Sequence, residues 1–321
     1  MGPPSPVRPH RSLLPWLVAA ALGVALATPG CGGGRQDESG GAEPATVDRG
    51  DGRAPGLLPP NADAAVARIA GSAGGRLGIA VAPLGGGPIE SVGELRTGRA
   101  WSTMKVPLLV ALVERLGGWE KLSPQEQSRA ELAITRSDNA AALALFDRLQ
   151  ELEGGLAPAS DAIEAVLRDS GDPDTEVNTE PNDQGFTTFG QTIWSAEASA
   201  GFMGALAAGC LLGSADSREV TSLMGDVVGE QRWGLGDAGY PAGVGLLAFK
   251  GGWGPEPGSG YLVRQIGAVG SVDDGLVVSI IAAAPGAGAA GFAAGRELVT
   301  EAARWVERAI GSAPAGRPAP C

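Results

Sequence analysis

Histidine is nearly absent from this sequence of 321 residues. The single histidine, His10, lies close to the first residue. The rest of the chain therefore has no imidazole, which excludes catalysis by Ser-His-Asp or Cys-His groups there. The common catalytic zinc sites are disfavoured too, because they use at least one histidine ligand. A serine nucleophile in this chain would need a lysine or a carboxylate as its base, and we expect neither a metal nor a cofactor.

Lysine is almost as scarce. Of the 24 basic residues only three are lysines, Lys105, Lys121 and Lys250, and the others are arginines. Burial can take the proton from a lysine but effectively not from an arginine. The retained lysines are therefore the ones to examine for chemistry, and two of them lie in motifs described below.

Cysteines are also few. The three are Cys31, Cys210 and Cys321. If Cys31 carries a lipid, as argued below, the other two remain in an oxidising compartment, and the sequence leaves open whether they pair.

Basic residues are fewer than acidic ones over the whole chain, whose formal net charge is −12 at pH 7. So acidic a protein is repelled by nucleic acids and by anionic lipid surfaces. We expect no nucleic-acid partner, and we expect a monomer.

The first 30 residues have the pattern of a signal peptide. Arg8 and Arg11 precede an apolar run over residues 13–27, which is short for a membrane span and is interrupted by Pro15. The pattern predicts export of the chain. Residues 31–60 and 311–321 are rich in glycine and proline, and we expect a flexible tether and a disordered tail.

Two cleavage sites compete at the end of this segment. Residues 28–31 read Thr-Pro-Gly-Cys and resemble a bacterial lipobox, from which Thr28 departs because leucine is preferred there. Cleavage before Cys31 would leave a lipid-carrying cysteine that anchors the protein at the outer face of the cell membrane. Cleavage after Ala27 would instead release a soluble secreted protein. We favour the lipoprotein.

The remaining sequence, residues 61–310, alternates between strand-like and helix-like patterns. Strands at both ends enclosing a block of helices predict an α/β (α+β) fold, with a five-stranded antiparallel sheet, flanking helices and an all-helical lobe. We place the sheet lobe at residues 61–101 and 240–310 and the helical lobe at residues 102–239. The expected elements are a helix at 61–70 capped by Asn61, strands at 77–84 and 89–95, helices at 102–116, 124–132, 137–149, 162–167 and 196–212, strands at 244–249, 261–269 and 276–283, and a helix at 291–310.

Three short motifs with chemical potential occur in order. Residues 102–105 read Ser-Thr-Met-Lys at the start of a helix, and the spacing of three places Ser102 and Lys105 on one helix face. Residues 137–139 read Ser-Asp-Asn, and residues 250–253 read Lys-Gly-Gly-Trp. Taken singly, the motifs suit a helix cap with a surface lysine, a second helix cap, and a strand end before a turn. The ordered triple, with two of three lysines in it, favours an active site.

This triple resembles that of the penicillin-recognising serine hydrolases, which include the class A β-lactamases and DD-peptidases. The resemblance covers residues 61–310. It implies that Ser102 is the acylated nucleophile, that Lys105 is its base and that Ser137 relays a proton to the leaving group. Substrate-binding positions follow from the same resemblance: Asn139 for the substrate amide, Lys250 for positive charge, and Gly252 and Trp253 beside an oxyanion hole formed by the N–H groups of Ser102 and Trp253.

Two departures from the family pattern concern the substrate and its release. The third motif of the family usually has threonine or serine after its lysine, with a hydroxyl that binds the substrate carboxylate, whereas this chain has Gly251. The Lys-x-Gly-Trp form resembles a group of exported β-lactamase-like hydrolases. Glu180, followed by Pro181, resembles the water-activating glutamate of class A enzymes, although a solvated acid is the competing interpretation.

The sequence thus predicts an exported serine hydrolase or acyltransferase that acts through a Ser102 acyl-enzyme on β-lactams or peptidoglycan-like peptides. The alternative is a non-catalytic binding lipoprotein of the cell envelope that keeps the fold. The physiological substrate, the retention of catalysis with Gly251 and the role of Glu180 in deacylation stay open at this level.

Overall fold

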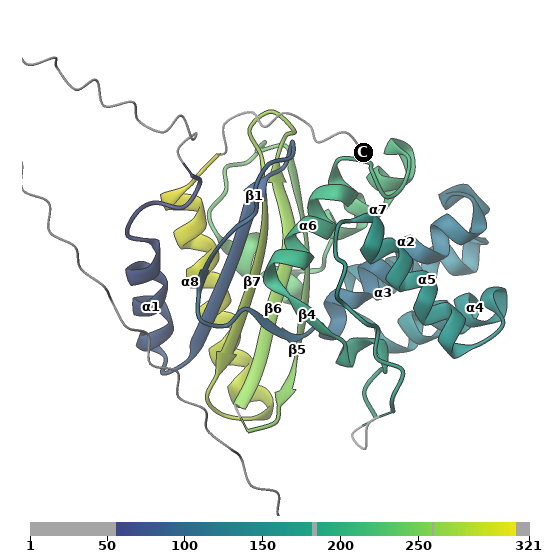
Figure 1. Cartoon of the computed structure of the whole chain (residues 1–321), viewed down its shortest axis with the longest axis horizontal. Helices are drawn as coiled ribbons and strands as arrows, with labels where there is room; N and C mark the ends of the chain where they lie inside the picture. The colour runs from purple at the N-terminus through teal and green to yellow at the C-terminus, as the bar shows by residue number, and fades with distance from the viewer. Residues whose placement is uncertain (1–55, 182–184, 259, 313–321) are drawn as a thin grey trace, which may run out of the picture. The chain divides into compact units, whose positions relative to one another are not determined.

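A five-stranded antiparallel sheet forms the centre of the fold in the computed structural model (Figure 1). The structure describes residues 56–181, 185–258 and 260–312. Across the sheet the strands are β2 (Glu90–Gly93), β1 (Arg76–Pro83), β7 (Leu276–Ala284), β6 (Gly260–Gly270) and β5 (Leu246–Glu256). β5 is therefore an edge strand, and the third sequence motif lies on it.

Both faces of the sheet are covered, so its strands are apolar on both sides. Residues on one face of the sheet, such as the paired Ile79 and Ile280, pack against α1 (Ala62–Ser72) and α8 (Gly288–Ala309). Residues on the other face, such as Ala80 and Ile281, belong to the core shared with the remaining helices. Figure 1 shows α1 and α8 on one side of the sheet and α6 (Ala196–Ala207) on the other.

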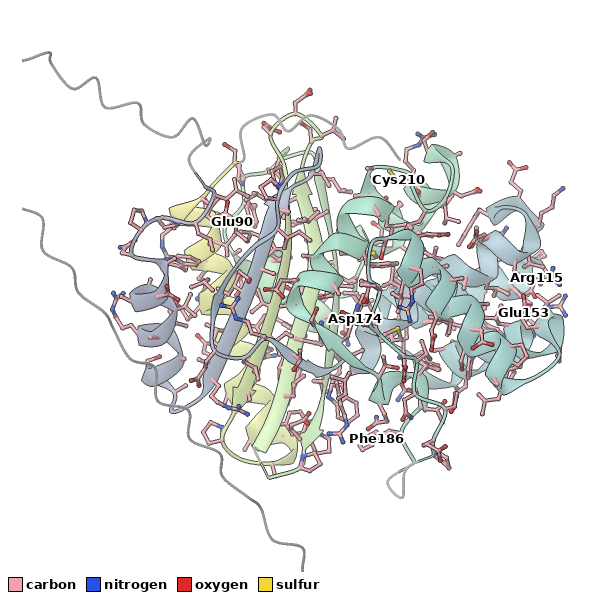
Figure 2. The ribbon with its side chains drawn as sticks, viewed as in Figure 1. Glu90, Arg115, Glu153, Asp174, Phe186 and Cys210 are labelled. Carbon is pink, nitrogen blue, oxygen red and sulfur yellow. The ribbon has the colours of Figure 1, made fainter. Side chains whose placement is uncertain are left out.

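The helical lobe lies beyond α6 in Figure 1. Its second helix, α3 (Pro124–Thr135), begins with a complete capping box, in which Ser123 and Glu126 satisfy one another's backbone N–H groups, and with Pro124 at the first helical position. Arg115 and Glu153 form an ion pair at its rim, with Nε and Oε1 2.5 Å apart (Figure 2). The helices of the lobe are α2 (Lys105–Leu116), α3 (Pro124–Thr135), α4 (Asn139–Glu153), α5 (Leu156–Asp169) and α7 (Ser214–Gly225).

The buried side chain of Arg264 joins the sheet to α6 and to a small second sheet of β3 (Thr97–Arg99) and β4 (Ile193–Ser195). Its guanidinium donates hydrogen bonds to the carbonyls of Gly98 (3.2 Å) and Trp194 (3.0 Å) and to the hydroxyl of Ser199 (3.0 Å). The same group lies 5.4 Å from the centroid of the Trp194 ring. Burial lowers the pKa of Arg264 to about 9. The Arg264 guanidinium thus links the two sheets and α6 through hydrogen bonds to neutral acceptors.

The predicted fold class and its five-stranded antiparallel sheet are confirmed. The lobe boundaries predicted from the sequence stay a prediction, and α6 lies between the two lobes because it packs on β1, β6 and β7.

Four local predictions were wrong in detail. Asn61 stands at the start of α1 without a side-chain cap bond. Helix α7 was missed, because its sequence is largely polar and buries few apolar side chains. Lys250 does not end its strand, since β5 continues to Glu256. The helix expected from residue 102 begins as a 3₁₀ turn, η1 (Trp101–Met104), and becomes α-helical at Lys105.

Several predictions fall outside the described residues: the signal peptide, the lipid on Cys31, most of the tether, the tail, and the partner offered for Cys210 at Cys321. Within the described ranges, every helix is too short or too polar to traverse a lipid bilayer.

Candidate active site

Ser102 sits at a sharp turn between β3 and α2. The residue before it, Trp101, has a φ of +49°, which is an unusual backbone conformation for a bulky side chain. η1 then leads without a break into α2, so Ser102 lies one 3₁₀ turn before the helix. The side chain of Ser102 is partly exposed, and its hydroxyl has no hydrogen-bond partner among the described residues. This hydroxyl is open to a substrate.

Lys105 is buried at the first position of α2, with 2% of its surface exposed. Its Nζ donates to the carbonyl of Ser137 (2.6 Å), to Oδ1 of Asn139 (2.7 Å) and to the carbonyl of Asp138 (3.2 Å). Burial lowers the pKa of Lys105 to about 7, and the nearby charge of Asp138 partly opposes that shift. Near neutral pH this amine is therefore able to accept a proton.

The three residues of the second motif, Ser137, Asp138 and Asn139, make different contacts. Ser137 adopts a φ of +58°, and its hydroxyl accepts a hydrogen bond from Lys250 Nζ (2.9 Å), with Lys105 Nζ on its other side at 3.5 Å. Asp138 caps α4 by accepting from the backbone N–H of Ala141 (2.7 Å), while Asn139 binds Lys105. The capping interpretation is thus correct for Asp138, and Ser137 lies between the two lysines.

Lys250 reaches the site from the edge strand β5 and is 1% exposed. Besides Ser137, its Nζ donates to the carbonyl of Gly251 (2.8 Å). Burial, together with the charge of Lys105, holds the pKa of Lys250 well below its usual range. Two lysines and one serine hydroxyl therefore form a chain from α2 to β5, and no carboxylate of the described residues binds either amine.

Gly252 allows β5 to approach the nucleophile turn. A Cβ at this position would lie 2.9 Å from the backbone nitrogen of Ser102 and 2.8 Å from the carbonyl oxygen of Ala100. The next residue, Trp253, is only partly buried and stacks its indole on Phe292, with ring centroids 4.8 Å apart. The strand backbone at Gly252 and Trp253 thus lies against the N-terminal turn that carries Ser102, as an oxyanion hole between them requires.

Backbone strain is concentrated at this site. Trp101 and Ser137 are the two non-glycine residues with positive φ in the described ranges. Such conformations cost on the order of 1–3 kcal/mol each and cluster where a structure fixes functional groups. Neither conformation could be predicted from the sequence, because neither residue type favours it.

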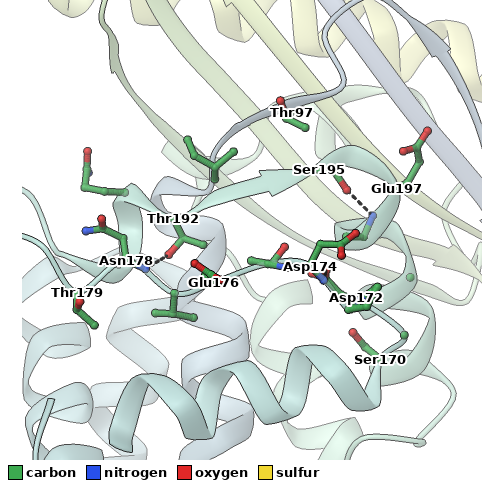
Figure 3. Close-up of a pocket in the computed structure, with 18 of the residues that line it drawn as sticks. Thr97, Ser170, Asp172, Asp174, Glu176, Asn178, Thr179, Thr192, Ser195 and Glu197 are labelled. Carbon is green, nitrogen blue, oxygen red and sulfur yellow. Dashed lines mark hydrogen bonds between the residues drawn. The ribbon is translucent and has the colours of Figure 1, made fainter. Parts of the chain in front are cut away.

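Among the described residues, no hydrogen bond or ion pair joins the Glu180 side chain to this cluster. This side chain is exposed. It contributes to the wall of a cavity of about 860 Å³, formed by residues 170–180, β4 and the start of α6. Figure 3 shows this cavity with Asp174, Glu176 and Glu197 around it. In this geometry the interpretation of Glu180 as a solvated acid is favoured.

Other contacts at the site were missed from the sequence. Trp101 packs on Gly254, where a Cβ would lie 2.2 Å from its Cζ2 atom. Phe186 meets the same indole edge-on, with ring centroids 4.9 Å apart. The only hint in the sequence was the concentration of glycines after Lys250, since glycine inside a strand often marks a close approach.

In the residues that the structure describes, no group of three or more His, Cys, Asp or Glu side chains is placed to hold a metal ion. What the arrangement can do rests on its own side chains: an open serine hydroxyl, a lysine of lowered pKa, a second serine between two amines, and backbone N–H groups at a helix start. These are the parts that acyl transfer through a serine needs.

No protein-family model matches the sequence, and no curated protein sequence matches it. Solved structures do match it. A variant of the class A β-lactamase of the last common ancestor of Gram-negative bacteria is 23% identical, with a TM-score of 0.58, and the match covers 77% of this chain and 97% of that one. A β-lactamase from Streptosporangium roseum is 17% identical, with a TM-score of 0.58, over 78% and 98%.

A third similar structure, PBP-A, is 21% identical to this chain, with a TM-score of 0.57, and the match covers 77% of this chain and 96% of PBP-A. The described chain therefore has the β-lactamase/DD-peptidase fold expected from the three motifs. Likeness at these identities establishes the fold, and the chemistry of this chain is argued from its own residues.

Proposed function

We propose that this chain is an exported serine hydrolase or acyltransferase that forms an acyl-enzyme at Ser102, with β-lactams or cell-wall peptides as its substrates. The observation that carries the proposal is the pair of buried lysines that meet at the Ser137 hydroxyl, beside an open Ser102. Lysine is rare in this chain. For a purely structural role, an arginine or a neutral side chain would serve better than two buried lysines beside one serine.

In the proposed acylation, Ser102 Oγ attacks the substrate carbonyl carbon and its proton passes to the neutral Nζ of Lys105. The carbonyl oxygen becomes negative and accepts hydrogen bonds from the backbone N–H groups of Ser102 and Trp253. Each such donor is typically worth about 3–4 kcal/mol in the transition state.

The intermediate then collapses as the bond to the leaving group breaks. The leaving nitrogen or oxygen takes a proton through Ser137, whose hydroxyl is held by Lys250. Water, or a second acceptor, completes the cycle by attacking the acyl ester and freeing Ser102. Because Glu180 contacts none of these groups, we expect this last step to be slow with penicillins and the acyl-enzyme to persist.

The test is labelling of the purified protein with a fluorophosphonate and with a fluorescent penicillin, followed by peptide mapping. We expect both reagents at Ser102, the penicillin more slowly, and neither in Ser102→Ala. A folded protein that neither reagent labels would overturn the proposal and favour a non-catalytic binding lipoprotein.

Export and anchoring form a separate part of the proposal, which rests on the apolar run that ends at Gly30 and Cys31. The mass of the mature protein distinguishes the two cleavage sites. We expect a lipid-modified N-terminus at Cys31 and recovery with membranes. A soluble product that begins at Thr28 would contradict the lipoprotein assignment.

A further inference from the structure

The cavity of about 860 Å³ in Figure 3 is separate from the lysine–serine cluster. Neither Ser102 nor either of the two site lysines lines it. It adjoins the segment that leads to the nucleophile, because the carbonyl of Thr192 in its wall accepts a hydrogen bond from the N–H of Ala100 (2.7 Å). Its volume is typical of sites that bind small molecules, and the acylation described above makes no use of it.

The wall formed by residues 170–180 is held in place by hydrogen bonds. The buried carboxylate of Asp172 accepts from the indole N–H of Trp194 (3.0 Å) and from the backbone N–H of Thr175 (3.1 Å). Arg168 donates to the carbonyls of Asp172 (2.7 Å) and Thr175 (2.8 Å). The cavity is therefore formed in advance, and a ligand would not have to order this wall.

Two large apolar side chains in the cavity wall are exposed. Ile193 on β4 is 55% exposed, the largest exposed fraction among the large apolar side chains that the structure describes. Ile89 is 39% exposed and lies close to Gly201 of α6, where a Cβ would be 3.4 Å from the Cδ1 atom of Ile89. A ligand that removes this apolar surface from water gains free energy. The cavity thus offers an apolar contact surface.

The charged side chains in the wall are all acidic. Four carboxylates besides that of Asp172 line the cavity, and no lysine, arginine or histidine of the described residues does. Asp174 and Glu176 are exposed, and their carboxylates form no hydrogen bond or ion pair with the described residues. Glu197 at the start of α6 lies 3.5 Å from Arg96. Since the described acids are not grouped to hold a metal ion, this combination of acidic and apolar surface matches an organic cation better than a metal.

We propose that this cavity binds a small organic cation that carries two positive charges on an apolar body, such as a diamine or a polyamine. The ammonium groups pair with Asp174 and Glu176 on one wall and with Glu197 on α6, while the body contacts Ile89 and Ile193. A small molecule fits better than a basic peptide, because a concave site of this volume buries most of a small ligand. The inference does not depend on acylation at the catalytic serine.

Isothermal titration calorimetry of the purified protein at pH 7 tests the proposal with four probes. 1,8-Diaminooctane has both the charges and the apolar chain, 1,8-octanediol keeps the chain alone, and magnesium chloride supplies a dication without a chain. Acetyl-Lys-Leu-Lys amide carries two charges on a peptide. One ion pair at an exposed carboxylate is worth up to about fivefold in affinity. We expect the diamine to bind roughly tenfold or more tightly than the diol and the peptide, and magnesium to show no saturable binding.

Two variants assign binding to the cavity. Asp174→Asn combined with Glu176→Gln removes two carboxylates that hold no other group, and we expect the diamine to bind roughly tenfold more weakly. Ile193→Ser removes exposed apolar surface, and we expect binding to weaken roughly threefold to tenfold. Glu219→Gln and Leu143→Ser are the matched controls, because both residues are exposed and neither lines the cavity. In both controls we expect unchanged affinity.

Absence of saturable diamine binding overturns the proposal, and so does equal affinity for the diamine and the diol. Unchanged diamine binding in the double carboxylate variant would place the ligand elsewhere on this acidic protein. Tighter binding of the peptide than of the diamine would contradict a small-molecule ligand, and saturable binding of magnesium would contradict an organic one. All of these results leave the labelling of Ser102, and with it the proposed function, unaffected.

Discussion

Two places in this fold bury positive side chains without a carboxylate partner among the described residues, and they use different residues to do so. At the candidate active site the buried cations are Lys105 and Lys250. At the junction between the sheet, α6 and the small second sheet the buried cation is Arg264. All three are at most 2% exposed.

The difference lies in what burial does to the proton. Burial lowers the pKa of Lys105 to about 7, so its amine changes charge near neutral pH. Burial lowers the pKa of Arg264 to about 9, so its guanidinium stays charged there and needs acceptors, which it finds in two carbonyls and a hydroxyl. A buried lysine can serve chemistry, whereas a buried arginine serves architecture.

The strongest test exchanges the residue type at the site. Lys105→Arg keeps the positive charge but cannot take the proton of Ser102. We expect the protein to fold and fluorophosphonate labelling of Ser102 to fall roughly 100- to 10,000-fold, the usual contribution of a general base. Circular dichroism controls for folding. Labelling at the normal rate in the arginine variant would show that Lys105 is not the base.

The reverse exchange tests the junction. Arg264→Lys retains charge but loses the planar fork that reaches three acceptors and the ring of Trp194. We expect the free energy of unfolding to fall by about 2–3 kcal/mol in urea titrations, because hydrogen bonds to charged groups are worth about 1.5–3 kcal/mol each. Arg96→Lys is the control, since Arg96 is only half-buried and pairs loosely with Glu197 at 3.5 Å. Equal losses of unfolding free energy in Arg264→Lys and Arg96→Lys would contradict a structural role for Arg264.

The pH dependence of acylation separates the two kinds of cation further. Because the neutral form of Lys105 is the base, the rate should rise with pH, about tenfold per unit below pH 7, and level off above about pH 8. Arg264 stays protonated over this range, so its titration does not contribute to the pH profile of the rate. Stopped labelling between pH 5.5 and 8.5 measures the profile, and a flat curve would contradict a lysine base.

The smallest effect is expected at an exposed acid. Glu180→Gln removes a carboxylate that contacts neither lysine. Because exposed substitutions usually change little, we expect the rate at which acylated Ser102 is freed to change less than about threefold. Mass spectrometry of the decaying acyl-enzyme gives that rate. A collapse of turnover in Glu180→Gln would instead show that this residue activates the deacylating water.

Much of this could be read from the sequence, for physical reasons. Strands that are buried on both faces leave continuous apolar runs, which is why β1, β6 and β7 were visible. The scarcity of lysine directed attention to Lys105 and Lys250, which the structure does bring together at Ser137.

What the sequence could not show is contact between distant segments. Trp233 and Gly251 meet only because β5 and the segment that carries Trp233 both pack against β6. The glycines after Lys250 read as a turn, although they continue a strand that approaches Trp101 and Ser102 closely. The left-handed backbone of Ser137 is imposed by its neighbours and not by its residue type.

The pairing of β1 with β7 has a consequence for how the chain reaches this state. Arg76 lies across from Ala283, so the middle of the sheet joins segments from near the two ends of the described chain. Contacts of such long sequence separation form late and slow folding. Until β7 arrives, the apolar residues 77–82 of β1 have no partner strand on that side. A nascent chain that stops before residue 276 should therefore be a client of chaperones rather than a folded protein.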